Sequence, residues 1–427
     1  MSQHAGRATK VTTISLLFGA QLFSYMIRYA LGIVAPILMS TYHLSPRTMG
    51  YILSGWNWSY TAGVPISGLL VDRFGPWIVM GSGSVVWGIS TIALPLAGTA
   101  ASLFLLRMIF GFAHSMLTPA GASAVSHEFG RRERTKAVAV VFTGNQVGLA
   151  ICATVAAFIL AHLGWKAVFY CIGGASLLLS LAWFLWYPDR RIGGGRSQSQ
   201  NLHDSKDGRM AGLTLLRYRS TWGISLGQMG YLYAYFFFVS WLPGYLVLER
   251  KMTLIESGIA SALPFWAGVV GTLGGGWLGD YLVLRGFTLT TSRKSVIGSG
   301  LLAATVFVVL AAYVEHSWLA VALLTLCVGS LRLATGSMNS LPIDLAPPAL
   351  VGSLTSIQNF FGNIGGLLAP IMGGLIISAT GSFALALLVA GGMALFGAAA
   401  YLFVLGNLDN SVRAPALPVQ PTRASCQ

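Results

Sequence analysis

Long apolar runs, separated by short polar segments, make up most of this chain. Each run holds about 20 or more mostly apolar residues, which is the length that an α-helix needs to cross the hydrocarbon layer of a bilayer. The predicted spans are residues 14–39, 49–71, 77–96, 103–125, 137–161, 167–186, 222–247, 257–284, 296–314, 318–341, 351–377 and 383–405. The pattern therefore predicts an all-α membrane protein with twelve transmembrane helices.

The twelve runs form two groups of six, with a long polar segment between them. That segment, residues 189–219, contains three consecutive glycines and seven Lys or Arg residues, a composition typical of a flexible linker. We therefore expect an N-terminal six-helix bundle at 1–187, a linker at 188–219, a C-terminal six-helix bundle at 220–406 and a tail at 407–427.

The two groups also share a short sequence pattern. Gly68 and Asp72 lie four residues apart at the end of the second span, and Gly276 and Asp280 have the same spacing at the end of the eighth. The two copies are 208 residues apart, at matching places in their groups. Such a repeat predicts two pseudo-symmetric halves with a binding site between them near the middle of the bilayer.

Composition and charge fit a membrane protein. The chain is 55% hydrophobic and only 9% charged, whereas soluble domains carry about 25% charged residues. The formal net charge of +14 lies in loops between apolar runs, so we expect no nucleic-acid partner. Of the 26 Lys and Arg residues, 19 fall on the side of both termini and the linker, and four on the other side. This bias predicts cytoplasmic termini in a multi-pass protein of a bacterial inner membrane.

The sequence offers little for catalysis or metal binding. The four cysteines share no short spacing, and we expect neither a metal site nor another cofactor. A Gly-x-x-x-x-Gly-Lys loop for nucleotide phosphates is absent from the sequence, and no set of nucleophile and base stands out. We therefore do not expect an enzyme.

Three arginines lie inside predicted spans: Arg28 in the first, Arg107 in the fourth and Arg332 in the tenth. No span interior contains Asp or Glu, and a charge at the bilayer centre costs roughly 3 kcal/mol or more unless it is paired or hydrated. A small organic anion would supply the missing charge, because the planar guanidinium binds both oxygens of a carboxylate.

Each arginine also has a structural alternative. Arg107 could reach the outer headgroups, and Arg28 could bond to backbone carbonyls. Arg332 could serve packing or gating instead. If Arg332 faces the binding site, however, a multiply charged substrate is favoured.

Several segments resemble known transport proteins. Residues 68–75, GLLVDRFG, are similar to the signature loop of the major facilitator superfamily, although Pro76 and Trp77 replace the basic residues that follow in the family. Other segments resemble its anion:cation symporter branch, which carries sugar acids, aromatic acids, vesicular glutamate and sialic acid. These segments are RYALGIVAP at 28–36, GFA at 111–113, GWKAVFY at 164–170, FVSWLPGYL at 238–246, DLAP at 344–347 and NFFGN at 359–363.

The resemblance implies a set of substrate-binding residues. In the branch, the first helix carries a substrate-contacting arginine eight residues before a proline, as Arg28 and Pro36 are spaced here. The other positions that match side chains lining the substrate site are Tyr25, Tyr60, Arg107, Asn145 and Asn359. Asn145 stands where several sugar-acid carriers have glutamine.

The signature loop has a physical role of its own. Asp72 and Arg73 are expected at the cytoplasmic mouth, where they can pair with a neighbouring helix end in one conformation and release it in another. Asp280 would act in the same way in the second half. The alternative is that these residues only cap helices.

Three positions depart from the branch. Ile27 and His114 replace the two carboxylates of proton-coupled members, and Asn339 replaces a tryptophan. His114 lies seven residues after Arg107, which places both on one helical face. An imidazole ordinarily titrates at about pH 6.5, so His114 could carry the coupling proton, contact the substrate without coupling, or serve packing.

The expected function is secondary active transport of a small organic anion, such as a sugar acid or aromatic acid, by alternating access with proton symport. An anion exchanger or uniporter without proton coupling remains an alternative, and a non-transporting anion receptor is a further one. We expect a monomer whose partners are the anion, the lipid bilayer and, as coupling ion, the proton.

Overall fold

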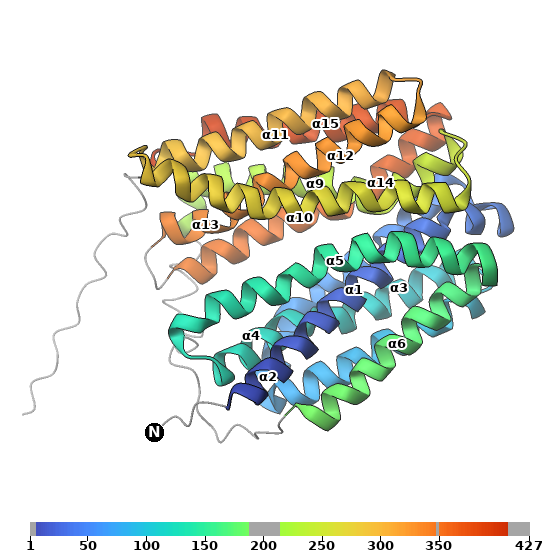
Figure 1. Cartoon of the computed structure of the whole chain (residues 1–427), viewed down its shortest axis with the longest axis horizontal. Coiled ribbons are helices and arrows are strands. Elements are labelled where there is room, and N and C mark those ends of the chain that lie inside the picture. The colour runs from blue at the N-terminus through green and yellow to red at the C-terminus, as the bar shows by residue number, and fades with distance from the viewer. Residues whose placement is uncertain (1–5, 188–213, 347–349, 409–427) are drawn as a thin grey trace, which may run out of the picture.

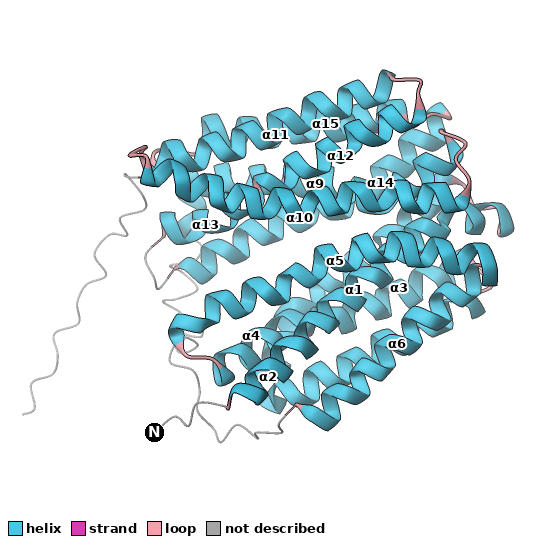
Figure 2. Ribbon diagram, in the orientation of Figure 1, coloured by secondary structure: helices cyan, strands magenta, loops and turns pink. Residues whose placement is uncertain are grey.

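The computed structural model describes residues 6–187, 214–346 and 350–408, and all regular structure in these ranges is helical (Figure 2). The first group of helices is α1 (Arg7–Thr41), α2 (Pro46–Ala93), α3 (Ala100–Ser115), α4 (Leu117–Glu128), α5 (Arg131–Leu163) and α6 (Trp165–Trp186). The second is α9 (Arg219–Leu248), α10 (Leu254–Leu284), α11 (Leu289–Tyr313), α12 (Ser317–Leu333), α13 (Thr335–Leu345), α14 (Val351–Thr380) and α15 (Ala384–Ala399). Figure 1 shows the two groups as separate layers. Most of the predicted linker and tail lies outside the described residues.

The described residues contain 11 helices that are long and apolar enough to cross a membrane. One of them, Pro46–Leu96, has 51 residues, and at 1.5 Å per residue it is about twice as long as one crossing requires. Gly75 interrupts it with φ 78 and ψ 164, a conformation that glycine adopts without a Cβ clash. The second and third predicted spans therefore lie on either side of Gly75, and the predicted all-α fold with twelve passes is confirmed.

The fourth and tenth spans are each broken at a corresponding place. Met116 separates α3 from α4, and Ala334 separates α12 from α13, within spans that are each 29 residues long. In the fourth span Pro119 lacks the amide hydrogen that would bond to the carbonyl of Ser115. The break positions extend the internal repeat beyond the Gly-x-x-x-Asp pattern.

The two groups touch through small residues. A Cβ on Gly50 would overlap the carbonyl of Pro370, and one on Gly258 would overlap Ala157. A Cβ on Gly32 would stand 3.0 Å from the carbonyl oxygen of Ser240, which is a less severe contact. Helices in a bilayer approach closely where side chains are small. These contacts lie toward the end opposite the linker, and the ribbons of α5 and α10 diverge toward the other end (Figure 1).

Candidate functional site

Arg28 of α1 is buried among aromatic rings of the first half. Its side chain is 5% exposed, and its guanidinium carbon lies 3.7 Å from the ring centre of Trp56 and 4.4 Å from that of Tyr25. Tyr60 stands on a third side at 5.6 Å. The negative faces of such rings stabilise a cation that has left water, but they do not neutralise its charge.

The guanidinium also contacts His114. Nη2 of Arg28 is 2.8 Å from Nδ1 of the imidazole. Because guanidinium has no acceptor, Arg28 donates this bond and Nδ1 accepts it. His114 is 2% exposed and stacks on Phe110 at 5.7 Å. In this arrangement Nδ1 cannot hold a proton of its own.

Arg107 of α3 is more deeply buried, at 1% exposure. Its side chain donates a long hydrogen bond from Nη1 to the carbonyl of Ile27, at 3.5 Å. The Nε atoms of Arg28 and Arg107 are both buried with no hydrogen-bond partner among the described residues. The two side chains therefore form a cationic pair with unused donors in the interior of the protein, where unpaired polar groups are costly. Arg107 does not reach outward toward the headgroups.

Arg332 of α12 lies in a different setting. Its Nη1 donates to the Tyr231 hydroxyl at 2.9 Å, and its Nε donates to Thr272 at 3.3 Å. The amide oxygen of Gln146 faces the guanidinium, because Arg332 offers only donors, and lies 2.6 Å from Nε and Nη2. The ring centre of Tyr235 is 5.2 Å from the guanidinium carbon. All four groups are neutral, and Arg332 stays partly exposed.

No hydrogen bond joins Asn145 of α5 or Asn359 of α14 to the three arginines among the described residues, and their place in the site stays a prediction. Asn145 is half-buried, and its Oδ1 has no partner among the described residues. Asn359 is exposed. The adjacent Gln146 is 4% exposed and bonds to Arg332. Sequence reasoning missed Gln146, although the glutamine that several sugar-acid carriers have at the position of Asn145 was a signal that could have drawn attention to its neighbour.

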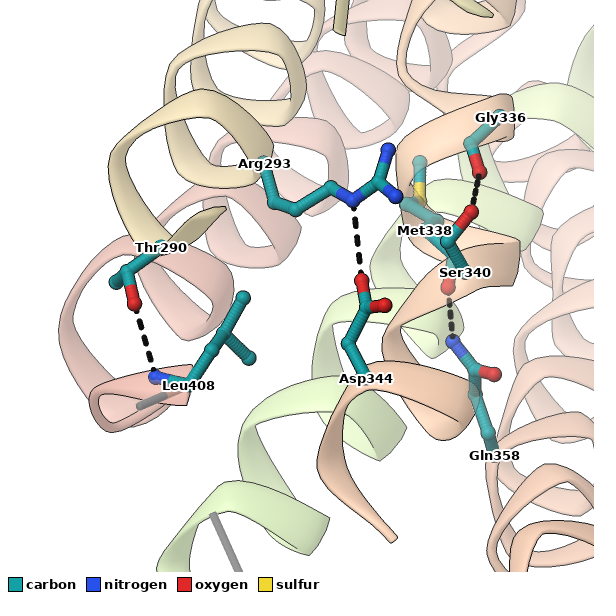
Figure 3. Close-up of polar contacts among 8 residues, drawn as sticks. All are labelled: Thr290, Arg293, Gly336, Met338, Ser340, Asp344, Gln358 and Leu408. Carbon is teal, nitrogen blue, oxygen red and sulfur yellow. Dashed lines mark hydrogen bonds and ion pairs between the residues drawn. The ribbon is translucent and has the colours of Figure 1, made fainter. Parts of the chain in front are cut away.

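The proposed gating residues lie at the linker end of the molecule. Asp72, Arg73 and Asp280 are exposed and form no ion pair with another described residue. Their gating role stays a prediction. At the same end of the second half, Nε of Arg293 donates to Asp344 at 3.0 Å and joins α11 to α13 (Figure 3).

The described residues contain no group of three or more His, Cys, Asp or Glu side chains that could hold a metal ion. The pair Arg28 and Arg107, and separately Arg332, instead supply hydrogen-bond donors and positive charge. Donors of this kind bind carboxylate or phosphate oxygens. The arrangement can therefore bind an anion.

Comparisons with known proteins identify the family of this chain. A family model described as Major Facilitator Superfamily matches residues 17–370, and the chain belongs to that family. In fold, it is similar to a bacterial homologue of the human lysosomal transporter Spinster, solved in an inward-facing and unoccupied conformation, with a TM-score of 0.81, 16% identity, and coverage of 94% of this chain and 98% of that chain. It is therefore a multi-pass membrane transporter and not an enzyme.

Several relatives of this chain are transporters of sugar acids. The chain is 30% identical to the D-galactonate transporter of Escherichia coli O6:H1 over 416 residues, which cover 93% of this chain and 95% of that protein. It is 28% identical to the probable L-galactonate transporter of Escherichia coli K12 over 95% of this chain and 91% of that protein. It is 27% identical to the probable galactarate/D-glucarate transporter GudP of the same strain, over 96% and 97%. The resemblance to the organic-anion branch is thus confirmed.

Proposed function

We propose that this protein carries a sugar acid or a similar small organic carboxylate across a bacterial inner membrane by alternating access. The observation that carries the proposal is the pair of buried guanidinium groups, Arg28 and Arg107, whose Nε donors have no partner among the described residues. A carboxylate can accept from both and neutralise part of their charge. Tyr25 and Tyr60, which flank Arg28, would line the same site.

The two six-helix units would move relative to each other around this site. The glycine contacts at the end opposite the linker support closure on that side, with Asp72, Arg73 and Asp280 free at the other mouth. The concentration of Lys and Arg near the termini and linker supports cytoplasmic placement of that mouth. We propose that one chain forms the complete carrier, because each arginine site is built from the described residues of a single chain.

His114 is the proposed proton carrier. In this structure Arg28 donates a hydrogen bond to Nδ1 of His114, and its positive charge disfavours an imidazolium beside it. An anion that draws the guanidinium toward itself would free Nδ1 and add a negative charge nearby. Anion binding and proton uptake would then favour each other, which is the linkage that symport requires.

The test is uptake of radiolabelled D-galactonate into proteoliposomes as a function of external pH. We expect the wild-type protein to accumulate the anion when the outside is acidic. His114→Gln should lose this pH-driven accumulation while retaining counterflow at a reduced rate. His127→Gln, which changes an exposed histidine of α4, is the matched control and should behave like the wild type.

The possible results separate the alternatives. Counterflow without any response of the wild type to a pH gradient would identify exchange or uniport, which the replacement of the branch's carboxylates by Ile27 and His114 also allows. An intact pH response in His114→Gln would remove this residue as the proton carrier. Absence of both binding and counterflow with every organic acid tested would overturn the transport proposal.

A further inference from the structure

Arg332 gives the C-terminal half a cationic site of its own. Its guanidinium is held by the Tyr231 hydroxyl, the Thr272 hydroxyl and the Gln146 amide, with the Tyr235 ring beside it. These partners supply dipoles but no negative charge. A cation in the membrane interior that is surrounded only by neutral groups remains uncompensated.

The site is shaped around this side chain. A Cβ on Gly268 of α10 would stand 3.1 Å from Cγ of Arg332 and 3.7 Å from the side-chain amide of Gln146. A larger residue would compete with the side chains of Arg332 and Gln146 for space. Arg332 as a residue is also partly exposed, so its neutral partners do not enclose it completely.

The two cationic sites are close neighbours across the interface between the halves. Gln146 belongs to α5 of the first half and bonds to Arg332 of the second. Aromatic rings connect the two sites: Trp56, 3.7 Å from the guanidinium carbon of Arg28, has its ring centre 5.6 Å from that of Phe236 in α9. The Phe236 ring in turn lies 5.7 Å from the ring of Tyr235, which is beside Arg332. A short run of aromatic rings therefore joins the N-terminal arginine pair to Arg332.

Charge balance then distinguishes between substrates. A monoanion bound at Arg28 and Arg107 would not neutralise the positive charge of Arg332. We propose that the carried anion has two negative groups, one bound by Arg28 and Arg107 and the other by Arg332, so that the preferred substrate is a sugar diacid rather than a sugar monoacid. This inference rests on the proposed function, because it assigns the substrate class of the same site.

Galactonate and galactarate are matched probes for the test. They share a six-carbon polyhydroxy chain and differ at one end, where galactarate has a second carboxylate in place of a primary alcohol. Binding of each to purified protein is measured by isothermal titration at constant ionic strength. We expect the wild type to bind galactarate about tenfold more tightly, or better, since one charge-assisted contact distinguishes the two ligands.

Variants test whether Arg332 causes this preference for galactarate. Arg332→Gln should bring the ratio of the two affinities close to one, whereas Gln146→Leu, which removes a neutral partner and keeps the charge, should retain a preference for galactarate. Arg285→Gln removes a positive charge from an exposed loop position and should keep the wild-type ratio. If Arg332→Gln does not fold, Arg332→Lys replaces it and should show an intermediate ratio, because lysine keeps the charge and loses the planar fork.

Equal affinities of the wild type for the two ligands would overturn the inference and leave the proposed function intact. A loss in Arg332→Gln that is the same for both ligands would overturn it too, because Arg332 would then only hold the two halves together through Gln146. Failure of the wild type to bind either acid, or any other carboxylate, would count against the proposed function instead.

Discussion

The two six-helix halves have corresponding helices but carry different side chains at corresponding positions. Arg28 lies eight residues before Pro36 in α1, and Tyr235 lies eight residues before Pro243 in α9. His114 and Arg332 each stand two residues before the break in their span, at Met116 and Ala334. At these corresponding positions the first half has a cation on the first helix and a neutral ring on the fourth, and the second half has the reverse.

The second helix of each half follows this exchange. Tyr60 and Gly268 each lie twelve residues before the aspartate of the repeated pattern. Tyr60 packs on the imidazole of His114, with ring centres 5.3 Å apart, whereas Gly268 leaves room for the long side chain of Arg332. The same positions therefore recur in both halves, and the residues at those positions decide what each half can bind.

The largest expected effect is at Arg28. Arg28→Gln removes the cation that contacts three aromatic rings and His114, and we expect binding of galactonate to fall about a hundredfold, since losing charge-assisted hydrogen bonds costs about 3 kcal/mol. Isothermal titration measures the change, with Arg285→Gln as control. A loss below about threefold would mean that the anion does not contact this half of the site.

A packing test at two corresponding glycines comes next. A Cβ on Gly111 of α3 would overlap the carbonyl of Trp56, whereas a Cβ on Gly329 of α12 would meet Ala267 at an ordinary 3.4 Å. We expect Gly111→Ala to destabilise the protein by about 1–3 kcal/mol, because backbone must shift. Thermal unfolding in detergent should show a clear fall for Gly111→Ala and little change for Gly329→Ala. Equal falls would contradict the difference in packing.

The smallest effect is expected at the position that corresponds to Arg28 in the second half. Tyr235→Phe removes a hydroxyl that lies 3.2 Å from the Gln146 amide, and it keeps the ring beside Arg332. Losing one neutral hydrogen bond should weaken galactarate binding by about fivefold or less, in line with about 1 kcal/mol. If the loss approached that of Arg28→Gln, the two halves would be contributing equally, and the contrast between them would disappear.

Local sequence information was enough for much of the fold. The polar linker, the long apolar runs and the glycine at position 75 predict the spans and the division between the second and third, because a helix in lipid must satisfy its backbone within one continuous segment. The arginines in spans were identified for the same reason, since any charge within such a run is conspicuous.

Contacts between spans required the tertiary structure. Arg28 and His114 are 86 residues apart in sequence and bond directly, and Gln146, rather than Asn145, reaches Arg332. Asn359 is exposed, and its role in the site stays a prediction. The sequence by itself determined which segments cross the membrane and which charges they carry. The hydropathy of a span does not tell how its helix is rotated about its own axis, and so it does not tell which side chains face a neighbouring helix. Close packing at glycines set the rotation of each helix, and with it which side chains meet between the halves.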